Sequence, residues 1–111
     1  MIESNTAHIV NISSMGGFQG ADKFAGLSAY SSSKAALNCL TECLAVEFKQ
    51  TPIKINALCL GAVETEMLSM AFPNFKAPVS SEEMAQFIHH FTLENHRFMN
   101  GKVIPVALST P

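Results

Sequence analysis

Three runs of mainly β-branched and other apolar residues mark the chain, and none of them alternates between apolar and polar positions. The runs cover residues 7–12, 53–60 and 102–108. Continuous apolar runs of this length are typical of strands with both faces buried, as in a parallel sheet. Ser13 and Ser14 end the first run, and Gly61 ends the second. Because Pro105 cannot donate a backbone hydrogen bond, we expect the third strand at an edge of the sheet.

In three other segments, the apolar residues have the spacing that is typical of helices. Residues 28–49 carry apolar or small side chains around more of a helix than one sheet can cover, and Ser28 is the expected N-cap. Its apolar and small side chains include Ala36, Leu37, Cys39, Leu40, Cys43, Leu44, Val46 and Phe48. Residues 64–72 predict a short methionine-rich helix. A last helix is expected from Ser80 onward, because acidic residues follow that serine in the first turn.

The predicted order is strand, helix, strand, short helix, helix, strand. Alternation of this kind predicts an α/β fold, with a parallel sheet and right-handed crossovers. The 111 residues suffice for one small domain, residues 1–111, but three strands make a thin sheet and the first begins almost at residue 1. We therefore expect a single partial domain, the second half of a larger one.

Composition narrows the range of partners. Hydrophobic residues make up 48% of the chain and charged residues 14%, which favours a packed core over disorder. A formal net charge of −2, with no cluster of Lys or Arg, argues against a nucleic-acid or anionic-membrane partner. The longest apolar runs are too short to span a membrane, and we expect no secretory signal.

Three cysteines, an odd number, predict reduced thiols in a cytoplasmic protein. Cys39 and Cys43 lie four positions apart in the first helix, a spacing that a metal ion can use. No further Cys or His stands at ligand spacing nearby, so we expect these thiols to pack in the core and no metal to bind.

The most informative spacing is that of Tyr30 and Lys34, one helical turn apart near the start of the first helix. A phenol is a poor acid at neutral pH, but a nearby ammonium and the positive end of the helix dipole both stabilise the phenolate. Such a pair can move a proton to or from an alcohol oxygen. Ser14 follows a parallel strand, where open α/β sheets bind ligands, and its hydroxyl could bond the same oxygen.

Each of these residues also has an ordinary structural interpretation. Ser14 could simply end a strand, Tyr30 could cover the core at a helix start, and Lys34 could be a solvated side chain. Taken one at a time, none of the three positions is specific for catalysis.

Together with their neighbours, however, these residues resemble the short-chain dehydrogenase/reductase family, of the 3-oxoacyl-ACP reductase type. The segments IVNISS, AYSSSKAAL and INALCLGAVETEM match three separate blocks of that family in order and spacing. The resemblance extends from about residue 7 to residue 108. It implies the C-terminal half of a Rossmann-like doubly wound parallel sheet, with three strands and flanking helices in this chain.

The resemblance also implies residue roles. Ser14 would polarise the substrate carbonyl, Tyr30 would donate or accept the proton, and Lys34 would stabilise the phenolate and bond the nicotinamide ribose. The residues implied to line the nicotinamide are Gly61, Val63 and Thr65. Hydride transfer would come from NAD or NADP.

Departures from the family pattern are equally visible. Leu60 stands where the family usually has proline, and the gap from Ser14 to Tyr30 is about three residues longer than usual, within the loop FQGADKFAG. No glycine-rich phosphate loop follows a first strand, so the chain lacks the family's means of holding the adenosine half of the dinucleotide.

Two functions remain open on the sequence. One is an NAD(P)-dependent oxidoreductase that interconverts a secondary alcohol and a carbonyl, with Tyr30 as general acid/base. The other is a truncated, inactive relative that acts as an assembly or binding module. The residues expected around an apolar pocket for a small carbonyl or alcohol substrate are Phe18, Met67, Leu68, Met70 and Phe72. The wide apolar surface of the first helix predicts a homodimer or homotetramer.

Overall fold

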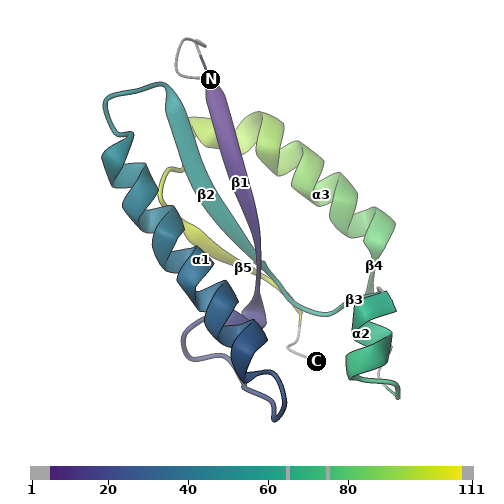
Figure 1. The fold of residues 1–111 in the computed structure, drawn as a ribbon. Helices are drawn as coiled ribbons and strands as arrows, with labels where there is room; N and C mark the ends of the chain where they lie inside the picture. The colour runs from purple at the N-terminus through teal and green to yellow at the C-terminus, as the bar shows by residue number, and fades with distance from the viewer. Residues whose placement is uncertain (1–5, 65, 75, 109–111) are drawn as a thin grey trace.

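The computed structural model describes residues 6–64, 66–74 and 76–108. Three strands form a parallel sheet: β1 (Ala7–Ser14), β2 (Ile53–Leu60) and β5 (Val103–Val106). Their order is β1–β2–β5, so β2 is central, as Figure 1 shows. The predicted α/β class is therefore confirmed, and β5 with Pro105 does lie at an edge of the described sheet.

Two long helices cover the opposite faces of this sheet, α1 (Ser28–Glu47) and α3 (Ser81–Glu94) (Figure 1). Side chains of successive strand residues point to alternate faces. Asn11 of β1 bonds to Thr41 of α1, whereas His8, an odd number of positions away, bonds to Thr92 of α3. This double cover explains why most of β2 is buried and why its sequence shows no alternation.

Smaller elements connect these layers. A 3-10 turn, η1 (Met15–Gly17), follows β1, and a second, η2 (Asn95–Arg97), follows α3. The elements between β2 and α3 are β3 (Val63–Glu64), α2 (Glu66–Ala71) and β4 (Val79–Ser80). The two-residue strands β3 and β4 pair in parallel with each other. They are too short to leave a periodic signal in the sequence and were not predicted.

The start of α3 is as predicted. Ser80 is the N-cap, its hydroxyl accepting from the Glu83 backbone N–H at 3.1 Å. Glu83 in turn accepts from the Ser80 backbone N–H at 3.1 Å, which completes a capping box.

The predicted cap of α1 is wrong. The N-cap is Leu27, which makes no side-chain cap bond, and Ser28 is already the first helical residue. The Ser28 carbonyl accepts the Ser32 hydroxyl at 2.6 Å, one turn further along. Ser28 is thus one residue too late for its hydroxyl to satisfy the free N–H groups of the first turn.

The face of α1 that packs on the sheet carries Asn38, Thr41 and Ala45, which are all buried. The expectation that Cys39 and Cys43 pack in the core is wrong, because both are exposed. The buried residues are spaced three and four apart, which directs the cysteines between them away from the sheet. Cys59 of β2, by contrast, is fully buried.

The opposite side of α1 is therefore apolar and uncovered in this chain. We call it the outer face of α1, and it consists of Ala36, Cys39, Leu40, Cys43 and Val46. Leu40 is 49% exposed and Val46 is 73% exposed. No helix among the described residues has the length and apolarity needed to cross a membrane.

A polar cluster around His8 and Asn56 joins β1, β2 and α3. The Asn56 side chain is held by two backbone partners, since it donates to the Met99 carbonyl and accepts from the Lys102 N–H. Its amide nitrogen also lies 2.9 Å from His8 Nε2, so Nε2 must accept and Nδ1 must carry the proton. Nδ1 then donates to the Thr92 carbonyl at 2.9 Å. The cluster thus requires a neutral His8.

Burial lowers the pKa of His8 below its ordinary value of 6.5; the bond to the Thr92 carbonyl opposes this shift and charge repulsion from His96 adds to it. A folded-state pKa below the unfolded value means that the unfolded chain binds the proton more strongly. The stability contributed by neutral His8 is therefore complete above about pH 6.5 and is lost as the pH falls through the folded pKa.

We predict that thermal unfolding of the protein shifts to lower temperature as the pH is reduced from about 7.5 to about 5, and that His8→Gln weakens this dependence. Glutamine offers Asn56 an uncharged acceptor and has no proton to gain. His89→Gln, at an exposed position of α3, is the matched control and should keep the wild-type dependence. An equal pH dependence in His8→Gln and wild type would contradict the assignment.

Candidate active site

Ser14 ends β1 and begins the turn that leads away from the sheet. Its hydroxyl oxygen caps η1 by accepting from the Gly16 backbone N–H at 3.0 Å. Because the oxygen accepts in this bond, the hydroxyl proton of Ser14 can donate elsewhere. The serine is thereby oriented by the backbone that follows it, with a donor to offer to a substrate oxygen.

The turn η1 is pressed against α1. A Cβ added to Gly17 would lie 2.6 Å from Lys34 Cβ and 2.6 Å from the backbone nitrogen of Ala35, so only glycine fits there. The Gly17 carbonyl accepts from the Asn38 side chain at 3.3 Å, and the Ser13 hydroxyl donates to the Lys34 carbonyl at 3.2 Å. These contacts fix the end of β1 against the first turns of α1.

Asn38 also reaches the central strand. Cys59 Sγ donates to Asn38 Oδ1 at 3.6 Å, which links β2 to the same buried amide. Burial raises the pKa of the Cys59 thiol, and its side-chain interactions with Ser13 and Asn38 oppose that rise. Cys59 is accordingly a buried neutral thiol of the core rather than a nucleophile.

Ser14 and Tyr30 converge on one point beside Gly16. An atom added to Gly16 as Cβ would lie 3.3 Å from Ser14 Oγ and 3.8 Å from the ring carbon Cε2 of Tyr30. The serine hydroxyl and the tyrosine ring thus border the same small space, although 16 residues separate them. The Ser31 hydroxyl oxygen lies 3.3 Å from the same point, so three side chains surround this side of Gly16.

Lys34 supports Tyr30 from the side. Its ammonium Nζ lies 5.7 Å from the centroid of the Tyr30 ring and donates to the Ile12 carbonyl at 3.2 Å. A cation at this distance from a ring is within the range of a cation–π contact. Lys34 is thus held between the end of β1 and the tyrosine, as the spacing of the two residues suggested.

These residues open onto a pocket with a volume of about 250 Å³. Its lining consists of Ile12, Ser13, Ser14, Met15, Gly16, Phe24, Leu27, Tyr30, Leu60, Gly61, Ala62, Val63, Leu68, Ala71 and Phe72. Four predicted site residues, Ser14, Tyr30, Gly61 and Val63, are therefore brought together. Lys34 lies behind Tyr30 and outside the lining. Thr65 lies outside the described residues.

The polar side chains of the lining are three hydroxyls, those of Ser13, Ser14 and Tyr30. None of the lining side chains that the structure describes is charged. Two hydroxyls at one end of an apolar cavity can bind and protonate a carbonyl oxygen, or deprotonate an alcohol. The arrangement is therefore suited to acid–base chemistry on an uncharged oxygen.

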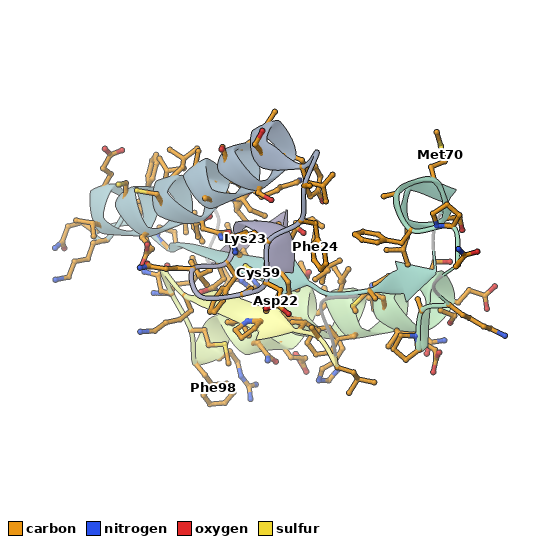
Figure 2. All side chains as sticks on the ribbon, turned by 90° about the horizontal axis from the view of Figure 1, so that it is seen from below. Asp22, Lys23, Phe24, Cys59, Met70 and Phe98 are labelled. Atoms are coloured by element: carbon orange, nitrogen blue, oxygen red, sulfur yellow. The ribbon has the colours of Figure 1, made fainter. Side chains whose placement is uncertain are left out.

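Not all of the predicted pocket residues are where they were expected. Leu68 and Phe72 line the pocket, but Phe18 does not, and Met70 is 78% exposed and points outward, as Figure 2 shows. On the short helix α2, one face turns to the pocket, so Met70 at two positions from Leu68 and Phe72 must turn away. The side chain of Met67 lies outside the part of the chain that the structure describes.

The sequence also left two lining residues unpredicted, Phe24 and Leu27, in the segment between η1 and α1. Apolar side chains in an irregular segment follow no period that could reveal where they point. The available signal was the pair of glycines around Phe24. Gly20 and Gly26 have φ values of 89° and 87°, and such left-handed turns let the loop fold back.

Comparison with known proteins identifies the family of the chain. Residues 1–75 match the family described as short chain dehydrogenase. The chain belongs to the short-chain dehydrogenase family. Among the similar members is the oxidoreductase UcpA of Salmonella typhimurium, which is 46% identical over 67 residues, covering 60% of this chain and 25% of UcpA. The chain thus spans about a quarter of the length of this short-chain dehydrogenase relative.

Solved structures of short-chain dehydrogenases share the fold as well. A 4-hydroxyisoleucine dehydrogenase mutant complexed with NADH and succinate has a TM-score of 0.76 at 25% identity, covering 95% of this chain and 47% of that one. The acetoin dehydrogenase YohF of Salmonella typhimurium has a TM-score of 0.71 at 29% identity, covering 93% of this chain and 42% of that one. The predicted C-terminal half of a Rossmann-like sheet is confirmed by these matches.

We predict that Gly17→Ala destabilises the protein by about 1–3 kcal/mol, since the added methyl group must displace the backbone of α1. The same displacement should move Lys34 relative to Ser14 and lower turnover. Denaturant unfolding measures the first effect.

Gly20→Ala serves as the control for Gly17→Ala. Its backbone has a positive φ of 89°, but a Cβ there meets nothing within 4 Å. It therefore carries backbone strain without a clash and should leave turnover near the wild-type value. Equal losses of turnover in the two variants would argue against the close approach as their cause.

Proposed function

We propose that this chain forms the catalytic part of an NAD(P)-dependent oxidoreductase that interconverts a secondary alcohol and a carbonyl compound. Ser14 and Tyr30 meet beside Gly16 in the lining of one apolar pocket, with Lys34 beside the tyrosine ring, and this is the observation that carries the proposal. The similar family members are oxidoreductases, which agrees with it.

In the direction of reduction, Tyr30 donates its phenolic proton to the carbonyl oxygen as the alcohol forms. In oxidation it takes the proton back. Ser14 donates a hydrogen bond to the same oxygen and stabilises the negative charge that builds there. Lys34 stabilises the phenolate that Tyr30 becomes, because its positive charge lies 5.7 Å from the ring.

The cofactor in this proposal is a nicotinamide dinucleotide, which supplies or accepts the hydride when bound. The site has features that fit its nicotinamide end. Gly61 and Val63 border the pocket next to the two hydroxyls with small or apolar surface, on which a flat ring can lie. Lys34 is the candidate partner for the ribose hydroxyls, and Thr65 the candidate partner for the carboxamide. A solved structure similar to this chain is a complex with NADH.

This activity is proposed for the whole protein that carries the chain. Residues 1–111 would be one partial domain, the catalytic C-terminal part of a Rossmann-like unit. A cytoplasmic location is part of the proposal, supported by three free thiols at Cys39, Cys43 and Cys59.

We further propose that the outer face of α1 pairs with a second copy of the protein, giving a homodimer or homotetramer. Leu40 and Val46 place exposed apolar side chains on a helix whose other side already packs on the sheet. Such surfaces commonly mark interfaces. The same observation favours the alternative function, an inactive relative that serves as an assembly module, so catalysis has to be tested separately.

Replacing Tyr30 by Phe removes the proposed proton carrier and keeps the ring beside Lys34. We expect turnover of carbonyl probes such as diacetyl or acetophenone with NADH or NADPH to fall by roughly 10²–10⁴-fold, while cofactor affinity is kept. Ser32→Ala is the control, because it deletes an exposed hydroxyl of the same helix and should be neutral. A Tyr30→Phe enzyme with more than about a tenth of wild-type turnover would falsify the role of Tyr30.

The proposed interface on α1 can be tested by introducing negatively charged side chains on its outer face. A double variant, Leu40→Glu with Val46→Glu, should shift the protein to monomers, because a dimer would bury unpaired carboxylates. Light scattering at tens of micromolar gives the mass. The control is Leu93→Glu, which charges a residue of α3 that is 57% exposed and should leave the assembly intact. A wild-type protein that is monomeric under these conditions contradicts the interface.

A further inference from the structure

The segment between η1 and α1 has an internal support that shapes its course. The Lys23 ammonium donates to the Phe18 carbonyl at 2.9 Å and to the Ala21 carbonyl at 2.7 Å. Two bonds from one cation to backbone carbonyls close this part of the loop into a compact turn. Phe24 follows directly, as Figure 2 shows, so its position is set by the ordered turn before it.

Phe24 contacts a residue from a distant part of the sequence. Its ring centroid lies 5.1 Å from that of Phe72, with the ring planes at 78°, which is the favoured edge-to-face arrangement. Phe72 follows α2 and is held by a bond from its N–H to the Leu68 carbonyl at 2.8 Å. Both rings line the pocket that contains Ser14 and Tyr30. The contact therefore joins two segments across one side of the active-site pocket.

The size and lining of this pocket, which is open to solvent on part of its surface, bear on what can react there. Its volume of about 250 Å³ lies just below the roughly 300–1,000 Å³ that is usual for ligand pockets. Its described lining offers no charged side chain to a substrate carboxylate or phosphate. A buried charge without a partner costs far more than a buried apolar group, so charged substituents are disfavoured.

We propose that Phe24 and Phe72 form an aromatic gate that selects small, uncharged carbonyl compounds with apolar substituents. The proposal deepens the function proposed above and rests on it. An edge-to-face pair of this kind shifts an equilibrium between closed and open arrangements by roughly two- to tenfold. Phe24 lies between Ser14 and Tyr30, in the stretch that is about three residues longer than the family pattern.

The gate is tested in the whole protein with three ketones: butanone, the bulkier acetophenone, and levulinate, which adds a carboxylate. Wild type should prefer butanone to levulinate by at least about tenfold in kcat/KM. Phe24→Ala and Phe72→Ala should each raise the ratio of kcat/KM for acetophenone over butanone by about tenfold. The double variant should raise the ratio by less than the product of the two, because either change breaks the same ring contact.

Matched controls separate the gate from general loosening. Met70→Ala alters the same short helix at a side chain that is 78% exposed, and Phe98→Ala removes a ring that is 74% exposed. Both should leave the ketone ratio unchanged. Phe24→Leu and Phe72→Leu keep apolar bulk and should shift the ratio less than alanine does. Thermal unfolding of each variant identifies any that fail to fold, and the leucine variants then decide the result.

The outcomes distinguish the gate from the proposed function. If turnover depends on Tyr30 but both phenylalanine variants keep the wild-type ratio, the function stands and the gate is refuted. Turnover of levulinate equal to that of butanone would refute the selection of uncharged substrates. Saturation-transfer NMR of the same ketones needs no turnover. If wild type turns over no ketone, altered preference for bound acetophenone in the alanine variants supports the gate, and an unaltered preference overturns it.

Discussion

The close approach of η1 to α1 is the constraint on which the rest of the site depends. At Gly17 the backbone of the turn lies so near Lys34 and Ala35 that a single methyl group has no space. That contact fixes the position of the first turns of α1 relative to the end of β1. Ser14 lies immediately before this turn, and Tyr30 lies one helical turn before Lys34. The contact therefore brings both residues to the same side of Gly16.

The same contact region explains the unusual inner face of α1. Asn38 and Thr41 are buried polar residues where a helix on a sheet would normally present leucine. Each is satisfied: Asn38 bonds to Gly17 and Cys59, while Thr41 bonds to Asn11 and to the carbonyl of Leu37. A satisfied polar seam fixes the position of a helix more narrowly than apolar packing does, because its bonds have directions. Leu40 and Val46 of α1, by contrast, lie on the outer face.

In the proposed function, the acid–base groups and the residues that select the substrate come from different segments of the pocket. Ser14 and Tyr30 lie where the end of β1 meets the start of α1, whereas Phe24 and Phe72 belong to a loop and to the end of a short helix. Positioning on rigid elements suits proton transfer, which depends on short distances. Contacts with the apolar part of a substrate tolerate more variation in distance. In the proposal these contacts come from Phe24 and Phe72, which lie on other segments than the acid–base pair.

The sequence by itself determined the α/β class, the three strands of the sheet and both long helices, since each depends on short-range pattern. It also named Ser14, Tyr30 and Lys34 as candidate site residues, from their spacing and from the family resemblance. It did not determine which side of α1 faces the sheet, because leucine and cysteine are compatible with either side. The hydrogen bonds of Asn38 and Thr41, which only the folded chain shows, identify the side that packs on the sheet. Nor could the sequence place Phe24 beside Phe72 or turn Met70 outward. Those positions follow from contacts between segments separated by dozens of residues, and only the folded chain brings their atoms within reach.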